Sequence, residues 1–467
     1  DDQDYGGPLA FHPRMPRQVS YAAPVLLLVA ATAFVIAQTS VFFAAALNAG
    51  DGAPGSEGME TVNLVNITVF EAIWNLWAVG GGGRLLAVLT FAASIVLPYG
   101  KLLILATMWF VPASTWSVHR RDRVLVLMDQ IGKITLADCS LFAVLSIMLQ
   151  APWNADADPS LRLQLGVSPR AGYIWQVFGT GVSLVVGHAM LAAHRIVERE
   201  SNKYIAQASV VQSTRTMSML ESQTNLRGSS AGGLLASFAD ALGGNSEGNM
   251  SVSQLAGHAK SGLVTLLLTT TLGLMLSGCF VGCFKVHWTG AVTSIRGLMH
   301  AGAYDYWTLW ELLVGLTRTG LQATAACIFV ETLLIIFCFV VPVLFIAAML
   351  VLWLCPMAPA VQYRMWVVLQ VVCAWGAMDI FTGAVFLSGL FSKDIYNFVN
   401  YSMEHGNLQP ICAGLQDSSG VVCLGAEPGL QMGIALILTA VVLWIACAIY
   451  VHIVMTRIRE GKMMQTM

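Results

Sequence analysis

Apolar segments long enough to cross a lipid bilayer recur along the whole chain, and they limit the fold more than any other feature. A spanning helix needs about 20 mainly apolar residues. Lipid admits only helices or closed barrels, because every backbone polar group must be hydrogen-bonded within the protein. The segments lack the alternation of a spanning strand. Eight helices are therefore predicted, over Tyr21–Leu47, Leu85–Val111, Val124–Leu149, Tyr173–Val197, Gly262–Val286, Leu321–Leu354, Met365–Phe391 and Leu430–Thr456.

Composition supports an all-α polytopic membrane protein. Hydrophobic residues make up 56% of the 467 residues and charged ones 11%, against roughly 25% charged in soluble domains. A formal net charge of −2 without a long basic stripe argues against a nucleic-acid partner. Ten cysteines in this length are too few for a scaffold built on disulfides.

The placement of lysine and arginine predicts the orientation, because cytoplasmic loops carry the excess of these residues. Thirteen fall on one side of the predicted helices and seven on the other. The richer side, which holds the cluster Arg120–Arg123 in a short loop, is predicted to be cytoplasmic. Both termini are then cytoplasmic, as an N-terminal segment over residues 1–20 and a tail over residues 457–467.

Between the fourth and fifth helices lies a polar segment, Glu198–Lys260, with a glycine- and serine-rich stretch from Gly228 to Ser251. Such a composition cannot bury a core. It predicts a cytoplasmic linker over residues 198–260, with one short helix near Leu234–Leu242. Serines and threonines in the linker leave phosphorylation open, although a plain tether is the better interpretation.

The two sides of this linker repeat each other. Thr68 and Glu71 followed by Gly80 recur as Thr308 and Glu311 followed by Gly320, at an offset of 240 residues. Leu97-Pro98, Trp109 and Pro112 recur 244 residues later, and Asp138 recurs as Asp379. The order of these pairs predicts two tandem four-helix modules, over residues 21–197 and 261–456. An even number of helices in each module makes the repeats parallel, related by an axis along the membrane normal.

Several of these motifs resemble one known family. The segment Gly132–Asp138 is similar to the GKWSMID element of the PqiA/LetA family, the paraquat-inducible protein A membrane proteins. Trp375–Phe381 resembles the same element in the second module, Pro98–Leu103 resembles the family's LPxxKL element, and Phe70–Trp77 fits its pre-helix segment. The resemblance implies tandem four-helix modules that act with MCE-type or other lipid-carrying proteins.

Two departures from the family pattern limit what the resemblance implies. Bacterial members carry CxxC zinc ribbons, whereas here only Cys279 and Cys283 come close, with the wrong spacing and inside a predicted helix. The second module also has Phe345 and Ala374 where Lys101 and Lys133 stand in the first. No metal or other cofactor is therefore expected.

Ionisable residues inside membrane helices are costly, and by default they mark functional sites. Asp138 lies about 21 Å into its helix, near the middle of the bilayer, and Lys133 follows Asp129 at the i, i+4 spacing that favours an ion pair. Lys101 is the expected neighbour of Asp138, and Thr135 shares its face. We predict a proton-responsive transport site, because burial raises the pKa of a carboxylate and a nearby lysine lowers it. The predicted polar network comprises Lys101, Asp129, Lys133, Thr135, Asp138, Glu331 and Asp379.

The alternative for these residues is a polar network that only holds helices together. For Asp379, which has no counterpart of Lys101 or Lys133 in its module, the two interpretations are equally supported. Glu331 lies deep in the sixth helix and is expected to line a cavity. Pro98 and Pro342 are candidate hinges, although prolines in membrane helices are often tolerated packing features.

The loops on the other side suggest an oxidising compartment. Cys412 and Cys423 are predicted to form a disulfide, and Asn66 and Asn400 begin glycosylation sequons on the same side. These features favour the plasma membrane or an endomembrane of a eukaryote, with a bacterial inner membrane as the alternative.

The motifs favour a lipid transporter that moves lipid between the bilayer and a partner. The rival is a tetraspan scaffold or auxiliary subunit, since Trp74-Asn75-Leu76-Trp77 has a faint similarity to the outer element of claudin-like tetraspans. An enzyme is not expected, because the chain carries no nucleophile elbow, Walker loop or His-Glu-x-x-His motif.

Overall fold

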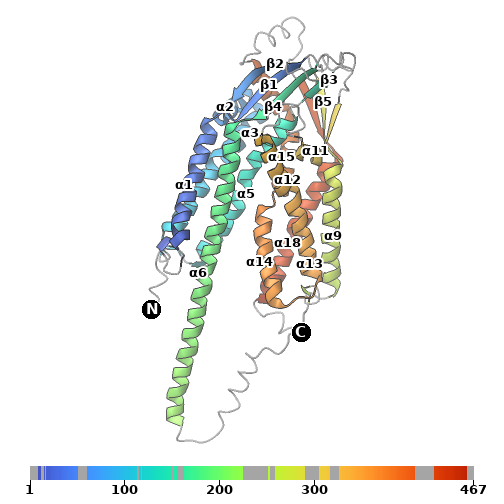
Figure 1. Ribbon diagram of the computed structural model, residues 1–467. Coiled ribbons are helices and arrows are strands. Elements are labelled where there is room, and N and C mark those ends of the chain that lie inside the picture. Colours follow the sequence, from blue (N-terminus) through green and yellow to red (C-terminus); the bar gives the residue numbers. More distant parts are fainter. Residues whose placement is uncertain are drawn as a thin grey trace.

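The computed structural model has two helical bundles side by side, with small β-sheets at one end (Figure 1). It describes residues 9–11, 15, 17–50, 60–112, 115–116, 118–148, 151–154, 162–224, 251–252, 258–289, 304–315, 325–404 and 425–459. The first helix begins and the last helix ends at the end opposite to the sheets (Figure 1). These two ends are called the sheet end and the tail end below.

The first module contains four long helices and four strands. Its second long helix has three parts, in which a π-helical turn, η3, joins α3 to α4. The elements are α1 (Arg17–Thr39), β1 (Phe43–Gly50), β2 (Glu60–Ile67), α2 (Val69–Val79), α3 (Gly81–Phe91), η3 (Ala92–Val96), α4 (Leu97–Phe110), α5 (Val118–Met148), β3 (Ala151–Asn154), β4 (Arg162–Pro169) and α6 (Ala171–Thr224), and the short helical turn η2 (Leu9–Phe11) precedes them.

The second module repeats this order, except that a helix, α16, stands where the first module has β3. A π-helical turn, η4, again joins two parts of the second long helix, but here the third long helix is also divided, into α14 and α15. The elements are α9 (His258–Phe280), β5 (Gly282–Thr289), β6 (Tyr304–Thr308), α11 (Leu309–Leu313), α12 (Ala325–Ile335), η4 (Ile336–Val340), α13 (Val341–Leu354), α14 (Pro359–Trp375), α15 (Met378–Leu390), α16 (Ser392–Glu404), β7 (Gly425–Leu430) and α18 (Met432–Arg459).

The expectation of an all-α polytopic membrane protein is confirmed. Among the described residues, seven helices or continuous helix pairs are long and apolar enough to cross a membrane. The 31-residue helix α5 lies beside α6 and α15 and completes two sets of four.

The structure adds two small antiparallel sheets that the sequence analysis did not foresee. The first module has the strand order β2-β1-β4-β3 and the second has β6-β5-β7. In each module an inner strand of the sheet, β1 or β5, follows the first long helix. A strand paired with it, β4 or β7, precedes the fourth long helix. The predicted first and fifth helices are therefore too long, because residues up to Leu47 and Val286 belong to β1 and β5. The fourth helix is longer than predicted and continues beyond Val197 to Thr224, since no glycine or proline interrupts residues 198–224. The predicted short helix Leu234–Leu242 lies outside the described residues.

The same capping box begins the short helix after the second strand of each module. Thr68 accepts a hydrogen bond from the backbone N–H of Glu71, whose carboxylate accepts one from the Thr68 backbone N–H. Thr308 and Glu311 form the same pair of hydrogen bonds before α11. The motif that revealed the repeat is thus a helix start present in both copies.

Loss of this cap in the second module is expected to cost about 1 kcal/mol of stability. Thr308→Ala removes the side-chain acceptor of the Glu311 N–H, and its thermal unfolding midpoint in detergent should fall. Thr308→Ser keeps the hydroxyl, so its thermal unfolding midpoint should equal that of the wild-type protein. Thr308 is a cleaner choice than Thr68, which is also the third residue of the Asn66 sequon. Equal midpoints for the alanine and serine variants would contradict the role of the cap.

Candidate functional site

A break in the third long helix of the second module lies where the two modules meet. α14 ends at Trp375 and α15 begins at Met378, so Gly376 and Ala377 form a non-helical link. The Gly376 N–H stays bonded to the carbonyls of Val372 and Cys373. The Ala377 N–H leaves its own helix and donates to the Phe337 carbonyl at 2.9 Å. The prediction of one continuous helix over Met365–Phe391 was therefore wrong.

The π-helical turn η4 makes the Phe337 carbonyl available. The Val341 N–H donates to the Ile336 carbonyl, five residues back. The next donor in that series would bond to Phe337, but it is Pro342, which has no N–H. The backbone of the broken helix supplies the missing donor, so Pro342 and the break complement each other.

Pro98 occupies the equivalent position in the first module, where a side chain of another helix bonds to a carbonyl of the π-helical turn. The Leu97 N–H donates to the Ala92 carbonyl across η3. Gln38 of α1 donates to the Ser94 carbonyl at 3.0 Å and accepts a hydrogen bond from Tyr99 at 3.1 Å. Both candidate hinges therefore lie beside π-helical turns whose carbonyls bond to another helix.

Lys133 of α5 connects the first module to this break. Its Nζ donates to the Cys373 carbonyl at 2.6 Å, and only 6% of the side chain is exposed. The last carbonyls of a helix carry partial negative charge, which favours a cation there. The sequence analysis placed Lys133 in the polar network but paired it with Asp129, whose side chain lies outside the described residues.

Two aromatic contacts surround the same break. Trp375 stacks on Phe337, with ring centroids 5.5 Å apart. Its ring also meets His188 of α6 at 5.6 Å, so a second residue of the first module contacts the end of α14. His188 therefore lies at the contact between the modules.

Lys101 of α4 is buried inside the first module, with 2% of its side chain exposed. Its ammonium lies against Gly132 of α5 so closely that a Cβ on Gly132 would collide with it. Gly187 of α6 faces the same lysine, since a Cβ there would lie 4.0 Å from Nζ. The glycine of the Gly132–Asp138 segment therefore makes room for a lysine from the neighbouring helix.

A buried polar stripe on α6 passes this lysine. Successive members are three, four or seven residues apart and so share one face of the helix, and 18 residues of helix span about 27 Å. They are Gln176, Thr180, Ser183, Gly187 and His194, all buried. The stripe crosses most of a bilayer within the first module.

The remaining residues of the predicted network are dispersed. Asp379 lies in the first turn of α15, where its Oδ1 accepts the Ile380 N–H at 2.9 Å, a favourable place for a carboxylate. Thr135 is buried and donates to the Gly132 carbonyl at 2.6 Å. Asp138 lies on α5, but its side chain is outside the described residues.

An apolar cavity of about 80 Å³ lies between the modules beside the break. α5 and α6 line it from the first module, and α12, η4 and the α14–α15 link line it from the second. Glu331 is not among the lining residues, although its neighbour Val330 is. They are Leu136, Cys139, Ser140, Tyr173, Val177, Gly181, Leu184, Val330, Leu333, Leu334, Phe337, Cys338, Trp375 and Ala377. The site thus combines an apolar space with a charged contact.

At the sheet end, α16 of the second module packs on α2 and α3 of the first. The Asp394 carboxylate lies against Gly82 so closely that a Cβ there would collide with it. Gly80 and Gly81 have positive φ angles of 79° and 52°, which glycine adopts without strain. The glycine run before α3 therefore permits both the turn and the approach of Asp394, a contact the sequence analysis missed.

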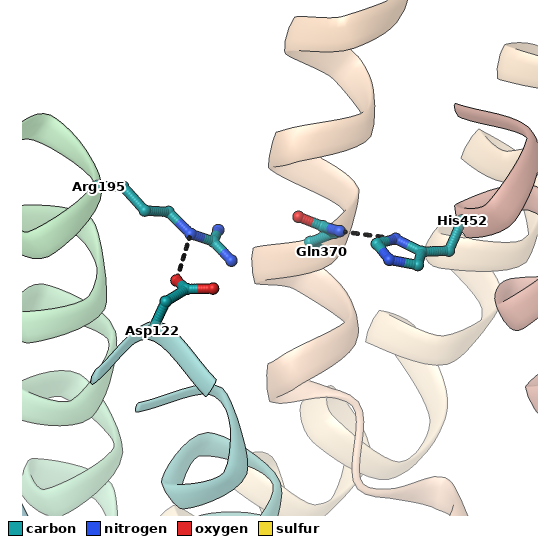
Figure 2. Close-up of polar contacts among 4 residues, drawn as sticks. All are labelled: Asp122, Arg195, Gln370 and His452. Carbon is teal, nitrogen blue, oxygen red and sulfur yellow. Dashed lines mark hydrogen bonds and ion pairs between the residues drawn. The ribbon is translucent and has the colours of Figure 1, made fainter. Parts of the chain in front are cut away.

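Towards the tail end, a polar contact joins the third and fourth helices within each module. Figure 2 shows Arg195 Nε of α6 at 3.9 Å from Asp122 Oδ1 of α5, and Gln370 Nε2 of α14 at 3.2 Å from His452 Nδ1 of α18. Such exposed contacts contribute little to stability, so the charged contact at the helix break is the more informative one.

The predicted loop features are only partly described. Asn66 is exposed on β2, and Asn400 lies on α16 with its side chain outside the described residues. Cys412 and Cys423 also lie outside them. Cys279 and Cys283 are buried free thiols, and burial raises the pKa of Cys283 to about 11, so this thiol stays protonated at neutral pH. No cluster of three His, Cys, Asp or Glu side chains that could hold a metal occurs in the described part of the chain.

These features define a polytopic α-helical membrane protein whose two helical bundles meet at a broken helix. The family model of paraquat-inducible protein A matches residues 58–163, from β2 to the start of β4. The resemblance predicted from the motifs is confirmed over this part of the first module. No curated protein and no solved structure matches the chain.

Proposed function

We propose that the protein transfers lipid between the bilayer and a lipid-carrying partner, and that the contact between the modules is its working site. The apolar cavity beside the broken helix carries this proposal, because both modules line it. A change in their contact would therefore alter the space offered to an acyl chain. The match to the paraquat-inducible protein A family supports the same class of function, and an MCE-type protein is the partner chemistry that the family resemblance implies.

The broken helix places a charged contact beside the apolar cavity. Discontinuous helices in transporters place charged or polar ends near the middle of the bilayer, where coupling ions bind. Here the end of α14 receives Lys133 from the other module. Loss of that hydrogen bond would leave a buried cation and a carbonyl oxygen without their partners. The free-energy cost of each unpaired group would favour a new arrangement of the modules.

We propose proton coupling as the energy source. Lys101 and the polar stripe of α6 support it, because they extend a polar path through an otherwise apolar module. In proteoliposomes, an imposed pH gradient should accelerate extraction of a fluorescent phospholipid by albumin, and a protonophore should abolish the acceleration. Equal rates with and without the gradient would reject the coupling and leave passive transfer.

Lys133→Met tests the working site directly. A hydrogen bond from a charged donor is worth about 1.5–3 kcal/mol, so albumin extraction should slow by about tenfold or more. Lys393→Met removes an exposed lysine of α16 and should transfer at the wild-type rate. The thermal midpoint in detergent identifies variants that merely unfold.

The rival function is a scaffold without transport. It is favoured by one observation, the hydrogen bond by which the Cys373 carbonyl already satisfies Lys133. A folded Lys133→Met protein with wild-type transfer would make that contact structural and support the scaffold.

The K/R distribution leads us to place both termini in the cytoplasm. The exposed sequon at Asn66 supports a eukaryotic plasma membrane or endomembrane over a bacterial inner membrane. Glycosylation mapping tests both points. Asn249 begins a third sequon, in the linker, and its modification in place of Asn66 would reverse the orientation.

A further inference from the structure

The helix α2 carries an exposed aromatic surface at the sheet end of the first module. Figure 1 shows α2 beside β2, at the edge of the bundle. Phe70 is 54% exposed, Trp74 70% and Trp77 48%, whereas the opposite face of α2 is buried through Val69, Ala72 and Leu76. Together with Phe91 of α3 they border one concavity, lined by Phe70, Glu71, Ile73, Trp74, Asn75, Trp77 and Phe91.

A cation lies at the edge of this surface. The Arg84 guanidinium carbon is 5.7 Å from the centre of the Trp77 ring, within the range of a cation–π interaction. In the described part of the chain, no carboxylate lies within ion-pair distance of Arg84. The nearby Glu71 carboxylate accepts the Thr68 N–H and hydroxyl and is engaged in the helix cap. Arg84 therefore offers donors to a further anion.

The surroundings of Arg84 place this surface at the boundary between lipid and water. Arg84 is in the first turn of α3, at the start of the candidate span Gly81–Phe110. Leu85, Val88 and Leu89, which follow it, are all exposed, as side chains facing acyl chains would be. Tryptophan at the two interfaces of a bilayer lies at the level of the headgroups, and arginine extends its guanidinium to the same level.

The second module provides an internal comparison at two described positions, those equivalent to Phe70 and Arg84. Trp310 takes the place of Phe70, and its ring packs between Phe280 at 5.8 Å and Phe339 at 5.5 Å. At the offset of 244 residues that relates the two second helices, Ile328 takes the place of Arg84. Among the residues that the structure describes, the exposed ring of Phe70 and the cation at Arg84 have no counterpart at these two equivalent positions of the second module.

We propose that this surface binds a phospholipid, with the headgroup phosphate on Arg84, the glycerol region against Trp77 and Trp74, and an acyl chain along Phe91. A guanidinium presents paired donors that match phosphate oxygens, and the aromatic rings supply the apolar and polar contacts of the interfacial region. The site deepens the proposed function by naming a phosphate-bearing lipid as the substrate class. Binding of lipid at this site does not depend on the proposed function. Only the step from binding to transfer rests on it.

The test uses the full chain in nanodiscs of digalactosyldiacylglycerol, a bilayer lipid without phosphate. The probe is phosphatidylglycerol with a photoactivatable acyl chain, at low mole fraction, and mass spectrometry measures adducts on the segment that holds Phe91. Arg84→Gln should lower this adduct yield at least fivefold. Arg170→Gln removes another exposed arginine at the sheet end and should leave the yield unchanged. Arg84→Lys, which keeps the charge but not the planar fork, should retain a reduced yield.

Three results would overturn the proposal. The first is an equal yield in wild-type and folded Arg84→Gln protein. The second is equal labelling by a photoactivatable diacylglycerol, which would show ordinary contact with surrounding lipid. The third is the absence of any adduct on this segment, the result expected if the surface binds a protein partner and no lipid. Adducts without albumin-dependent transfer would keep this site and reject the proposed function, whereas transfer without adducts would do the reverse.

Discussion

Gly132→Ala is expected to destabilise the protein by about 2 kcal/mol, within the range for overpacked cores. The added Cβ would collide with the Lys101 ammonium and lie 2.8 Å from Leu184 Cδ2. Lys101 is buried and Gly187 of α6 faces it, so its ammonium can yield only at the cost of its own packing. The measurement is the thermal unfolding midpoint in detergent, which should fall by several degrees.

Two comparisons isolate the cause of this effect. Gly100→Ala, on the same helix as Lys101, meets no atom within 4 Å and should be neutral or slightly stabilising, since alanine favours helix. In a Lys101→Ala background the loss from Gly132→Ala should fall below about 1 kcal/mol, because residues in contact are not additive. An equal loss in both backgrounds would refute the packing of Lys101 against Gly132.

The repeat could be predicted from sequence because its markers have fixed local roles. Thr68 and Thr308 cap helices, and Pro98 and Pro342 follow π-helical turns. Such roles depend on a few neighbouring residues, so they keep their spacing while the surrounding sequence changes.

The strands could have been predicted in part. From Phe284 to Trp288, apolar residues alternate with Lys285 and His287, and the apolar ones are buried in β5. That alternation predicts a strand, but the preceding apolar run of α9 concealed it. β1 has no such signal, because Phe43 to Leu47 are all apolar and suit a buried helix equally well.

The helix break could not have been predicted, because its cause lies in another part of the chain. The link at Gly376 and Ala377 depends on the free Phe337 carbonyl and on Lys133 from the first module. The sequence analysis identified Lys133 by its cost in a membrane, but only tertiary structure reveals that its partner is a backbone carbonyl 240 residues away.

Gly172→Ala and Gly433→Ala are each expected to be more destabilising than Gly132→Ala, for a reason that tests the repeat itself. Each glycine is the second residue of the fourth long helix of its module. A Cβ on Gly172 would lie 2.8–2.9 Å from the carbonyl oxygens of Ala37, Ser40 and Val41. A Cβ on Gly433 would lie 2.5 Å from the Val281 oxygen and 2.7 Å from that of Gly282.

In both modules the fourth helix therefore begins against the backbone that connects the first helix to the inner strand, β1 or β5. Backbone atoms fixed by a helix and a sheet cannot move aside as a flexible side chain can, so we expect a loss of about 3 kcal/mol in each module. Gly273→Ala in α9 meets no atom within 4 Å and serves as the matched control. If only one of the two variants lowers the thermal midpoint, the modules are not equivalent at this contact, and the parallel repeat does not extend to their helix packing.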